Sequence, residues 1–159
     1  MERNAWGFSL FCDDIRWEVG GKTSAMGIYL SDMRFETDFP IVVAKFGILV
    51  KYFEMPGVFK DDLILRVFSP GDEKDKPSIN MEVPRSTMGD GATKFPMEED
   101  QERIITLTMP IILSPLPIKQ EGFIKVRMHC GHVITNLGSL WVHKAAPASI
   151  ENSGVTVSG

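Results

Sequence analysis

The chain has 159 residues, of which 43% are hydrophobic and 24% are charged, and its formal net charge is -4. This length suits one domain with a sizeable core, and the composition is that of a soluble globular protein. The negative charge excludes a general electrostatic attraction to nucleic acid or to an anionic membrane surface, so any partner has to be argued from local features.

The start of the chain carries no recognisable targeting segment. An apolar run from Trp6 to Phe11 ends at the carboxylates Asp13 and Asp14, too soon for a signal-peptide core or a membrane span. We therefore expect a protein that does not enter a membrane and that resides in the cytoplasm or in a particle released by lysis.

The two cysteines, Cys12 and Cys130, lie far apart and show no CxxC spacing. Neither a disulfide framework nor a zinc module is indicated, so both are predicted to be buried thiols.

The stretch FCDDIRWEVGGKTSAMGIY, residues 11–29, is predicted to form a β-hairpin. Gly20 and Gly21 favour a two-residue turn, because glycine adopts positive φ without steric cost. That turn pairs Trp17 with Ser24. One face then becomes a core stripe, formed by Ile15, Trp17, Met26 and Ile28. The other face is predicted to carry a ladder of alternating charge, formed by Asp14, Arg16 and Glu18.

The adjacent carboxylates Asp13 and Asp14 raise the question of a catalytic pair. Catalytic carboxylates of glycoside hydrolases face each other at roughly 5 to 9 Å, whereas neighbouring residues of a strand point to opposite faces. We therefore expect structural carboxylates. Strict alternation directs Asp13 inward, where it needs hydrogen-bond donors or a bulge that turns it aside.

The same stretch resembles the N-terminal signature of a family of uncharacterised small proteins from bacteria and their phages, in which a phrase close to FCDDIR-x-E-x-x-x-K-x-S-x-x-G-x-Y recurs. The match covers the first quarter of the chain, at Phe11, Cys12, Asp13, Asp14, Ile15, Arg16, Glu18, Lys22, Ser24, Gly27 and Tyr29, with DM at Asp32-Met33 and FP at Phe39-Pro40 after it. The resemblance implies a shared fold and a phage or prophage context. It implies no catalytic residue, because the family has no assigned activity.

The middle of the chain alternates as half-buried strands do. Over residues 42–52 the even positions are apolar, at Val42, Ala44, Phe46, Ile48, Val50 and Tyr52, while Lys45 and Lys51 fall on the opposite face. Residues 63–69 and 78–83 are predicted to be strands joined by the exposed turn SPGDEKDKP. Residues 85–99 are predicted to form a long surface loop and residues 103–113 a strand, after which SPLPI crosses in extended form to the last strands.

The last two strands have the clearest pattern. Ile124, Val126, Met128 and Cys130 are predicted to face the core. A three-residue turn, Gly131-His132-Val133, would place Ile124 opposite Leu140 and keep Leu140 and Val142 inward. The outward residues of this terminal hairpin then include Phe123, Arg127, Trp141 and His143.

About eight strands at this spacing predict an all-β fold, a two-sheet antiparallel sandwich of immunoglobulin-like or C2-like type. Residues 1–144 would form the single domain, and residues 145–159, rich in small side chains, a tail. The residues predicted to be buried together are Phe46, Ile48, Ile124, Val126, Leu140, Ile15 and Trp17.

Four sets of residues suggest metal, phosphate or nucleic-acid chemistry, and each has a simpler explanation. In HCGH, alternation sends His129 and Cys130 to opposite faces and leaves His132 in a turn, so no zinc site is expected. The acidic loops at Asp61-Asp62 and in GDEKDK lack a calcium pattern, because Lys74 and Lys76 would repel a cation. The Gly89-x-Gly91 pair lacks the residues of a phosphate loop. The outward basic and aromatic patch of the terminal hairpin could stack on nucleic acid, but the acidic chain favours a solvated or covered sheet face.

Three classes of function remain. The first is a non-enzymatic interaction or assembly protein, in its most concrete form a phage- or prophage-derived virion or accessory component. It needs no cofactor and binds a protein partner or a second copy through Phe123, Arg127, Trp141 and His143. The second is a module for carbohydrate or small ligands that stack on Trp141 and Phe123. The third is a hydrolytic enzyme that uses Asp13, Asp14 and His129, which the geometry disfavours.

Overall fold

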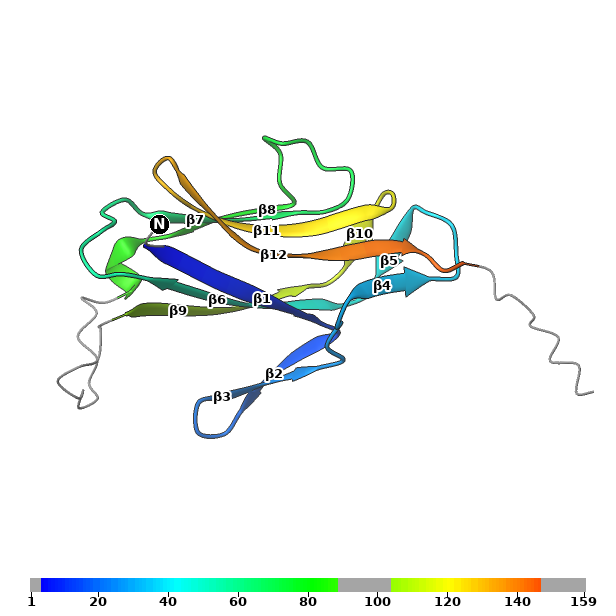
Figure 1. Ribbon diagram of the computed structural model, residues 1–159. Coiled ribbons are helices and arrows are strands. Elements are labelled where there is room, and N and C mark those ends of the chain that lie inside the picture. Colours follow the sequence, from blue (N-terminus) through cyan, green and yellow to red (C-terminus); the bar gives the residue numbers. More distant parts are fainter. Residues whose placement is uncertain (1–3, 89–103, 147–159) are drawn as a thin grey trace, which may run out of the picture.

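The computed structural model describes residues 4–88 and 104–146, and in these ranges the protein is all-β (Figure 1). Within the described residues, the one helical element is the short 3-10 helix η1 (Arg85–Met88). The same residues form twelve strands: β1 (Ala5–Cys12), β2 (Asp14–Glu18), β3 (Lys22–Met26), β4 (Asp32–Phe35), β5 (Ile41–Val43), β6 (Phe46–Glu54), β7 (Leu63–Phe68), β8 (Ile79–Val83), β9 (Ile105–Leu113), β10 (Leu116–Ile118), β11 (Gly122–Cys130) and β12 (Val133–Lys144). The all-β prediction is confirmed, but the expectation of about eight strands was too low.

The strands form a five-stranded sheet in the order β4-β12-β11-β7-β8, a three-stranded sheet in the order β1-β6-β9, and two small pairs, β10-β5 and β2-β3. Figure 1 shows the five-stranded sheet above the three-stranded one. Strand β4 runs parallel to the end of β12, so the largest sheet is mixed and the prediction of purely antiparallel sheets was wrong. A parallel neighbour is possible here because more than 90 residues separate β4 from β12 along the chain.

One cluster of buried side chains lies between the two larger sheets. It joins the alternate residues of β6 to those of β7, β11 and β12, among them Phe46, Ile48, Val50, Leu63, Leu65, Ile124, Val126 and Leu140. Burying one such side chain contributes about 1.5 to 3 kcal/mol. The predicted core positions Phe46, Ile48, Ile124, Val126 and Leu140 are therefore confirmed.

The strand predicted over residues 42–52 is two strands. Val42 lies in β5 and is 68% exposed, because β5 leaves the sheet to pair with β10, and Ala44 lies exposed in the break before β6. The predicted inward set is therefore wrong for these two residues and right from Phe46 to Tyr52.

The exposed turn between β7 and β8 is confirmed. The Asp72 carboxylate closes it by accepting hydrogen bonds from the Ser69 N–H at 2.8 Å, the Ser78 N–H at 2.9 Å and the Ser78 hydroxyl at 2.6 Å. The loop predicted over residues 85–99 begins with η1, and its remainder lies outside the described residues.

The terminal hairpin has the predicted register at Ile124 and Leu140, which lie opposite each other. Its turn is one residue shorter than predicted, because Cys130 pairs with Val133 across Gly131 and His132. A bulge compensates: Val126 pairs with Gly138 and Arg127 with Asn136, which leaves Leu137 as an extra residue on β12. Leu137 is 1% exposed, so the bulge places one more apolar side chain in the core.

The opening hairpin is confirmed, with a register one residue away from the predicted one. Glu18 pairs with Lys22 and Trp17 with Thr23, so the loop has three residues, in which Gly20 and Gly21 have φ of 84° and 76°. Trp17 is 70% exposed, and Met26 and Ile28 are also exposed, so only Ile15 of the predicted core stripe is buried. The stripe fails because β2 and β3 form a sheet of their own that stands away from the main core (Figure 1).

The end of the domain is held at Ala145, whose N–H donates to the Phe35 carbonyl at 2.7 Å. The predicted tail of residues 145–159 falls outside the described residues from residue 147 on. No helix within the two described ranges is long and apolar enough to cross a membrane.

Candidate functional site

The terminal hairpin carries a row of rings on its outward face. Phe123 and Trp141 are opposite each other in the β11–β12 ladder, with ring centroids 4.8 Å apart, and His143 follows Trp141 at 6.0 Å. Alternation along the two strands places them there, because Ile124, Leu140 and Val142 occupy the inward positions. The outward orientation predicted for these three rings is confirmed. Phe123 is 46% exposed, whereas Trp141 and His143 are partly covered.

His143 is held by the neighbouring strand. Its Nε2 lies 2.7 Å from Asp32 Oδ2, and the same oxygen accepts a hydrogen bond from Arg34 Nε at 2.6 Å. Ser31 donates to the other oxygen at 2.5 Å. The Arg34 guanidinium first, then His143 and Ser31, hold the pKa of the Asp32 carboxyl well below its usual range. His143 thus fastens β4 to the end of β12.

A surface groove of about 470 Å³ lies beside Phe123. Its lining includes Phe123 and three cationic side chains, Lys74, Lys125 and Arg127. Of the four predicted docking residues, the structure therefore brings Phe123 and Arg127 together in one groove, while Trp141 and His143 lie outside its lining.

The acidic residues of the groove are already engaged. Asp72 closes the β7–β8 turn, and Glu121 accepts a hydrogen bond from the Lys144 N–H at 2.7 Å. Arg127 donates to the carbonyls of Val126 and Gly138, and neither Lys74 nor Lys125 forms an ion pair with a described residue. The groove thus gathers three cationic side chains on a chain of net charge -4.

In the opening stretch, the backbone bulges at Asp13. The Asp13 N–H donates to both the Met26 and Gly27 carbonyls, and the side chain is exposed, so of the two alternatives for Asp13 the structure has the bulge that turns it aside. The predicted hydroxyl donor exists: Tyr29 donates to Asp13 Oδ1 at 2.5 Å. Desolvation and this carboxylate raise the pKa of Tyr29 above its usual value.

Asp14 points to different partners from Asp13. It forms ion pairs with Arg16, at 3.1 Å, and with Lys45, and these two cations lower its pKa, Lys45 most strongly. The predicted charge ladder is therefore present from Asp14 to Arg16, but Glu18 forms no ion pair with a described residue. Asp13 and Asp14 do not converge on one site.

The HCGH residues separate as predicted. Cys130 is buried, His132 is exposed in the turn, and His129 lies on the outward face, where desolvation and the nearby Arg66 and Arg127 lower its pKa. Among residues 4–88 and 104–146, no group of three or more His, Cys, Asp or Glu residues is arranged to hold a metal ion.

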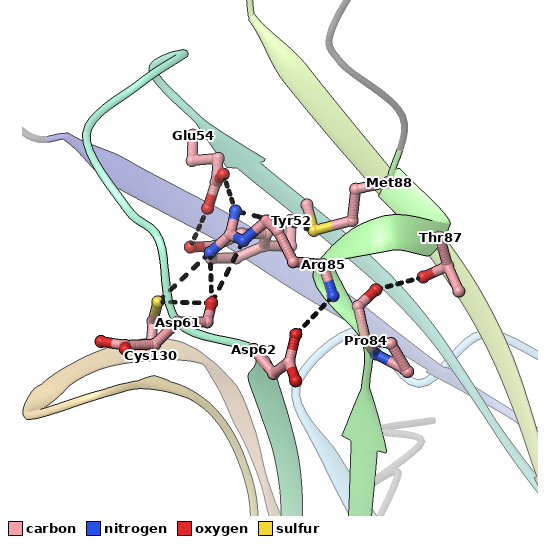
Figure 2. Close-up of polar contacts among 9 residues, drawn as sticks. All are labelled: Tyr52, Glu54, Asp61, Asp62, Pro84, Arg85, Thr87, Met88 and Cys130. Atoms are coloured by element: carbon pink, nitrogen blue, oxygen red, sulfur yellow. Dashed lines mark hydrogen bonds and ion pairs between the residues drawn. The ribbon is translucent and has the colours of Figure 1, made fainter.

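Sequence reasoning missed a buried polar cluster around Arg85, shown in Figure 2. The Glu54 side chain is 1% exposed, forms an ion pair with Arg85 and accepts a hydrogen bond from the Tyr52 hydroxyl at 3.0 Å. Arg85 Nη2 also donates to the Asp61 carbonyl at 2.8 Å and lies 3.3 Å from Cys130 Sγ. The cluster joins the end of β6 to η1, to the start of β7 and to the end of β11.

Two further hydrogen bonds hold this cluster together. The Arg85 N–H is capped by Asp62 Oδ1 at 2.7 Å, and the Cys130 thiol donates to the Asp61 carbonyl at 3.4 Å. Burial raises the pKa of Cys130 although the Arg85 guanidinium opposes the shift. A thiol that is 4% exposed and protonated is a poor nucleophile, so the cluster stabilises the fold rather than presenting reactive groups.

One signal in the sequence pointed to this cluster. Glu54 continues the inward alternation of Phe46, Ile48, Val50 and Tyr52, and a carboxylate at such a position needs a buried cation. Which of the 17 lysines and arginines supplies it could not be chosen without the fold.

Comparison with protein-family models, with curated proteins and with solved structures finds no match to this chain.

Proposed function

We propose that this protein is a non-enzymatic interaction module that docks a protein partner on the outward face of its terminal hairpin. The observation that carries the proposal is the half-exposed Phe123, whose ring lies against that of Trp141 and lines a groove with three cationic side chains. Aromatic residues and arginine carry most of the energy of protein interfaces once they are desolvated.

We also propose that the fold is a sandwich of the immunoglobulin-like or C2-like type. Two facing sheets that share one cluster of buried residues support it. In such sandwiches the outward face of a hairpin can bind a partner without disturbing the core, because the core is formed by the alternate, inward residues of the same strands.

The chemistry of the groove favours a partner segment that carries carboxylates beside an apolar side chain. Lys74, Lys125 and Arg127 would meet the carboxylates, and the ring of Phe123 would cover the apolar group. A long nucleic-acid strand is disfavoured, because the chain as a whole is acidic.

The setting that we propose is a phage or prophage, with the protein as a virion or accessory component in the cytoplasm or in the particle. The resemblance of residues 11–29 to small bacterial and phage proteins supports this setting. The proposal that the protein is not an enzyme is supported by the positions of the three candidate catalytic residues. Asp13 and Asp14 contact different partners, and His129 lies on another sheet.

The groove also supports a second candidate function, the binding of a carbohydrate or another small ligand. Its volume of about 470 Å³ lies within the range of ligand pockets, which is roughly 300 to 1,000 Å³. Phe123 would then be the stacking platform, and calorimetric titration with neutral and acidic oligosaccharides would detect such binding.

The proposal is tested by capture on the immobilised full chain from its own host, followed by affinity measurement with each purified partner. Trp141→Ala and Phe123→Ala should each weaken binding by about 2 kcal/mol or more, a factor of about 30. Ile134→Ala is the matched control, because Ile134 is 57% exposed on the same strand but lies at its other end. Equal affinities for Trp141→Ala, Phe123→Ala and the wild type would exclude the hairpin face as the docking surface.

A further inference from the structure

The outward face of the five-stranded sheet holds two arginines side by side. Arg127 on β11 and Arg66 on β7 lie directly opposite each other in the antiparallel ladder. Both side chains point outward, because the neighbours of Arg127 along the strand, Val126 and Met128, are buried in the core. Opposite residues of such a ladder have Cβ atoms about 4.5 to 5.5 Å apart, so two positive charges are brought close together.

His129 extends this pair of arginines. It lies two residues after Arg127 on the same strand and therefore on the same face. Its Nε2 atom is shielded from solvent and has no hydrogen-bond partner among the described residues. Desolvation, and then the charges of Arg66 and Arg127, lower the pKa of the ring. A buried imidazole nitrogen without a partner is costly, and beside two guanidinium groups the partner that suits it is an acceptor with negative charge.

We call Arg66, Arg127 and His129 the arginine–histidine cluster, and it lacks a counter-charge within the part of the chain that the structure describes. Neither arginine forms an ion pair there. Arg66 Nε donates to Asn80 Oδ1 at 3.0 Å, and Arg127 Nη1 donates to two backbone carbonyls, so these acceptors are neutral. Glu82 on β8 is near in the ladder, but it also forms no ion pair with a described residue. Like charges directly opposite each other destabilise a sheet, so a bound anion would relieve this arrangement.

The three side chains together identify the class of anion. Each guanidinium can bind two oxygens of a carboxylate or a phosphate with parallel hydrogen bonds. A carboxylate has one charge and two oxygens, too few for two guanidinium groups and an imidazole. A phosphate monoester carries a charge between about -1.5 and -2 at neutral pH and has three terminal oxygens. It therefore matches the two arginines in charge and leaves an acceptor for the histidine.

We propose that the arginine–histidine cluster binds the phosphate group of a phosphate monoester, with Arg66 and Arg127 as the charged donors and His129 Nε2 as the third donor. The long arginine side chains have many rotamers, so they can turn toward a ligand and open access to the ring. This site goes beyond the function proposed above, because Arg66 and His129 lie outside the lining of the groove beside Phe123.

Nuclear magnetic resonance of the histidine rings tests where the phosphate binds. The chain has three histidines, so His132 and His143 are internal controls for His129. The full chain is titrated with glycerol phosphate at constant pH and constant ionic strength. The ring signals of His129 should shift and saturate, whereas those of His132, in an exposed turn, and His143, held by Asp32, should stay in place. No shift of His129, or an equal shift of all three histidines, would overturn the site.

Calorimetric titration with glycerol phosphate tests which side chains bind it. Arg66→Ala should weaken binding about tenfold or more, because it removes a charged donor. Arg66→Lys should fall between this variant and the wild type, since lysine keeps the charge but not the planar fork. Lys51→Ala is the matched control: it removes one positive charge from β6, on the other large sheet. Equal affinities for Arg66→Ala and Lys51→Ala would exclude the cluster, and circular dichroism verifies that each variant is folded.

The choice of ligand tests the class of anion. Dimethyl phosphate, a diester with one negative charge, and acetate should each bind at least about tenfold more weakly than glycerol phosphate. A diester that binds as tightly as the monoester would overturn the assignment to a monoester. A phosphoserine peptide then identifies what carries the phosphate: tighter binding of the peptide indicates a protein partner, and equal binding indicates a small molecule. A failure of phosphate binding leaves docking at Phe123 and Trp141 untouched.

Discussion

Arg85, in the short helix after β8, forms an ion pair with Glu54 at the end of β6, where the glutamate side chain is 1% exposed. Arg85 also donates to the Asp61 carbonyl, just before β7, and lies beside Cys130 at the end of β11, so the cluster ties together segments that are far apart along the chain (Figure 2). Removing one partner of a buried pair leaves an uncompensated charge, which is far more costly than the net contribution of the pair itself.

We therefore expect Arg85→Ala to lower the free energy of unfolding by about 3 to 5 kcal/mol, measured by urea denaturation. Arg66→Ala is the control, because among the residues that the structure describes Arg66 makes a single side-chain hydrogen bond, exposed and to Asn80, and its loss should cost less than about 1 kcal/mol. The double variant Arg85→Met with Glu54→Leu should recover most of the loss. A loss for Arg85→Ala as small as that for Arg66→Ala would show that Glu54 is not held as a buried charge.

The contact between Tyr29 and Asp13 fixes the bulge at which the chain leaves β1 for the projecting hairpin. Asp13→Asn should lower the free energy of unfolding by about 1 kcal/mol, or a melting temperature by a few degrees, because the hydroxyl loses a charged acceptor. Tyr29→Phe should cost a similar amount, and the two losses should not add when combined, because both substitutions act on the same hydrogen bond. An unchanged melting temperature in both single variants would contradict a structural role for Asp13.

The bulge also needs a glycine nearby. Gly27 has a φ of 66°, and a Cβ at this position would lie 2.2 Å from Asp13 Oδ2. Gly27→Ala should therefore destabilise the protein more than Asp13→Asn, because it adds backbone strain to the loss of the contact. Gly57→Ala is the control for the clash with Asp13. Gly57 has a similar φ of 76°, but an added Cβ there would meet no other atom, so Gly57→Ala should lower the free energy of unfolding only by the backbone strain.

Alternation along strands predicted much of the fold from sequence. It identified the core residues of β6 and β11, the inward positions of Leu140 and Val142 on β12, and the pairing of Ile124 with Leu140. It succeeded there because these strands are covered on one face, so a shift of one residue would expose every apolar side chain. The turn was predicted one residue too long, and the bulge at Leu137 shows why the register survived: the extra residue moved from the turn into the strand.

Alternation failed where no facing sheet enforces it. Trp17 fits the pattern of a core residue but belongs to a hairpin outside the main core. The row of Trp6, Phe8 and Leu10 on β1 was not recognised as a sheet face, since local pattern does not tell whether the outer side of a sheet is covered. The parallel pairing of β4 with β12, which brings Asp32 to His143, depends on the topology alone.

Asp32 makes stability depend on pH at the acidic end. In the folded protein its pKa is held below the unfolded value of about 3.9. The charged carboxylate therefore adds its full share to the free energy of unfolding above about pH 4, and this share is lost as the pH falls through the lower pKa of the folded state. Asp32→Asn should therefore flatten the decline of the melting temperature below about pH 4. Asp75→Asn, in the exposed β7–β8 turn, should leave the decline as in the wild type. Equal acid profiles for wild type and Asp32→Asn would show that Arg34 and His143 do not stabilise the charged form of Asp32.

Cys130 can report on the Arg85 cluster, with Cys12 as an internal control. Both thiols are buried, at 4% and 0% exposure, and burial raises the pKa of each, so alkylation should be slow for both in the wild type. Arg85→Lys keeps a cation for Glu54 but loses the guanidinium that lies 3.3 Å from Cys130 Sγ and binds the Asp61 carbonyl. Local opening of this end of the fold should then speed the alkylation of Cys130 several-fold, while Cys12, on the three-stranded sheet, should keep its wild-type rate. Mass spectrometry of peptides after timed alkylation measures the two rates separately. Equal acceleration of both cysteines would mean that the substitution acts through global unfolding, and that Arg85 does not close this end of the fold locally.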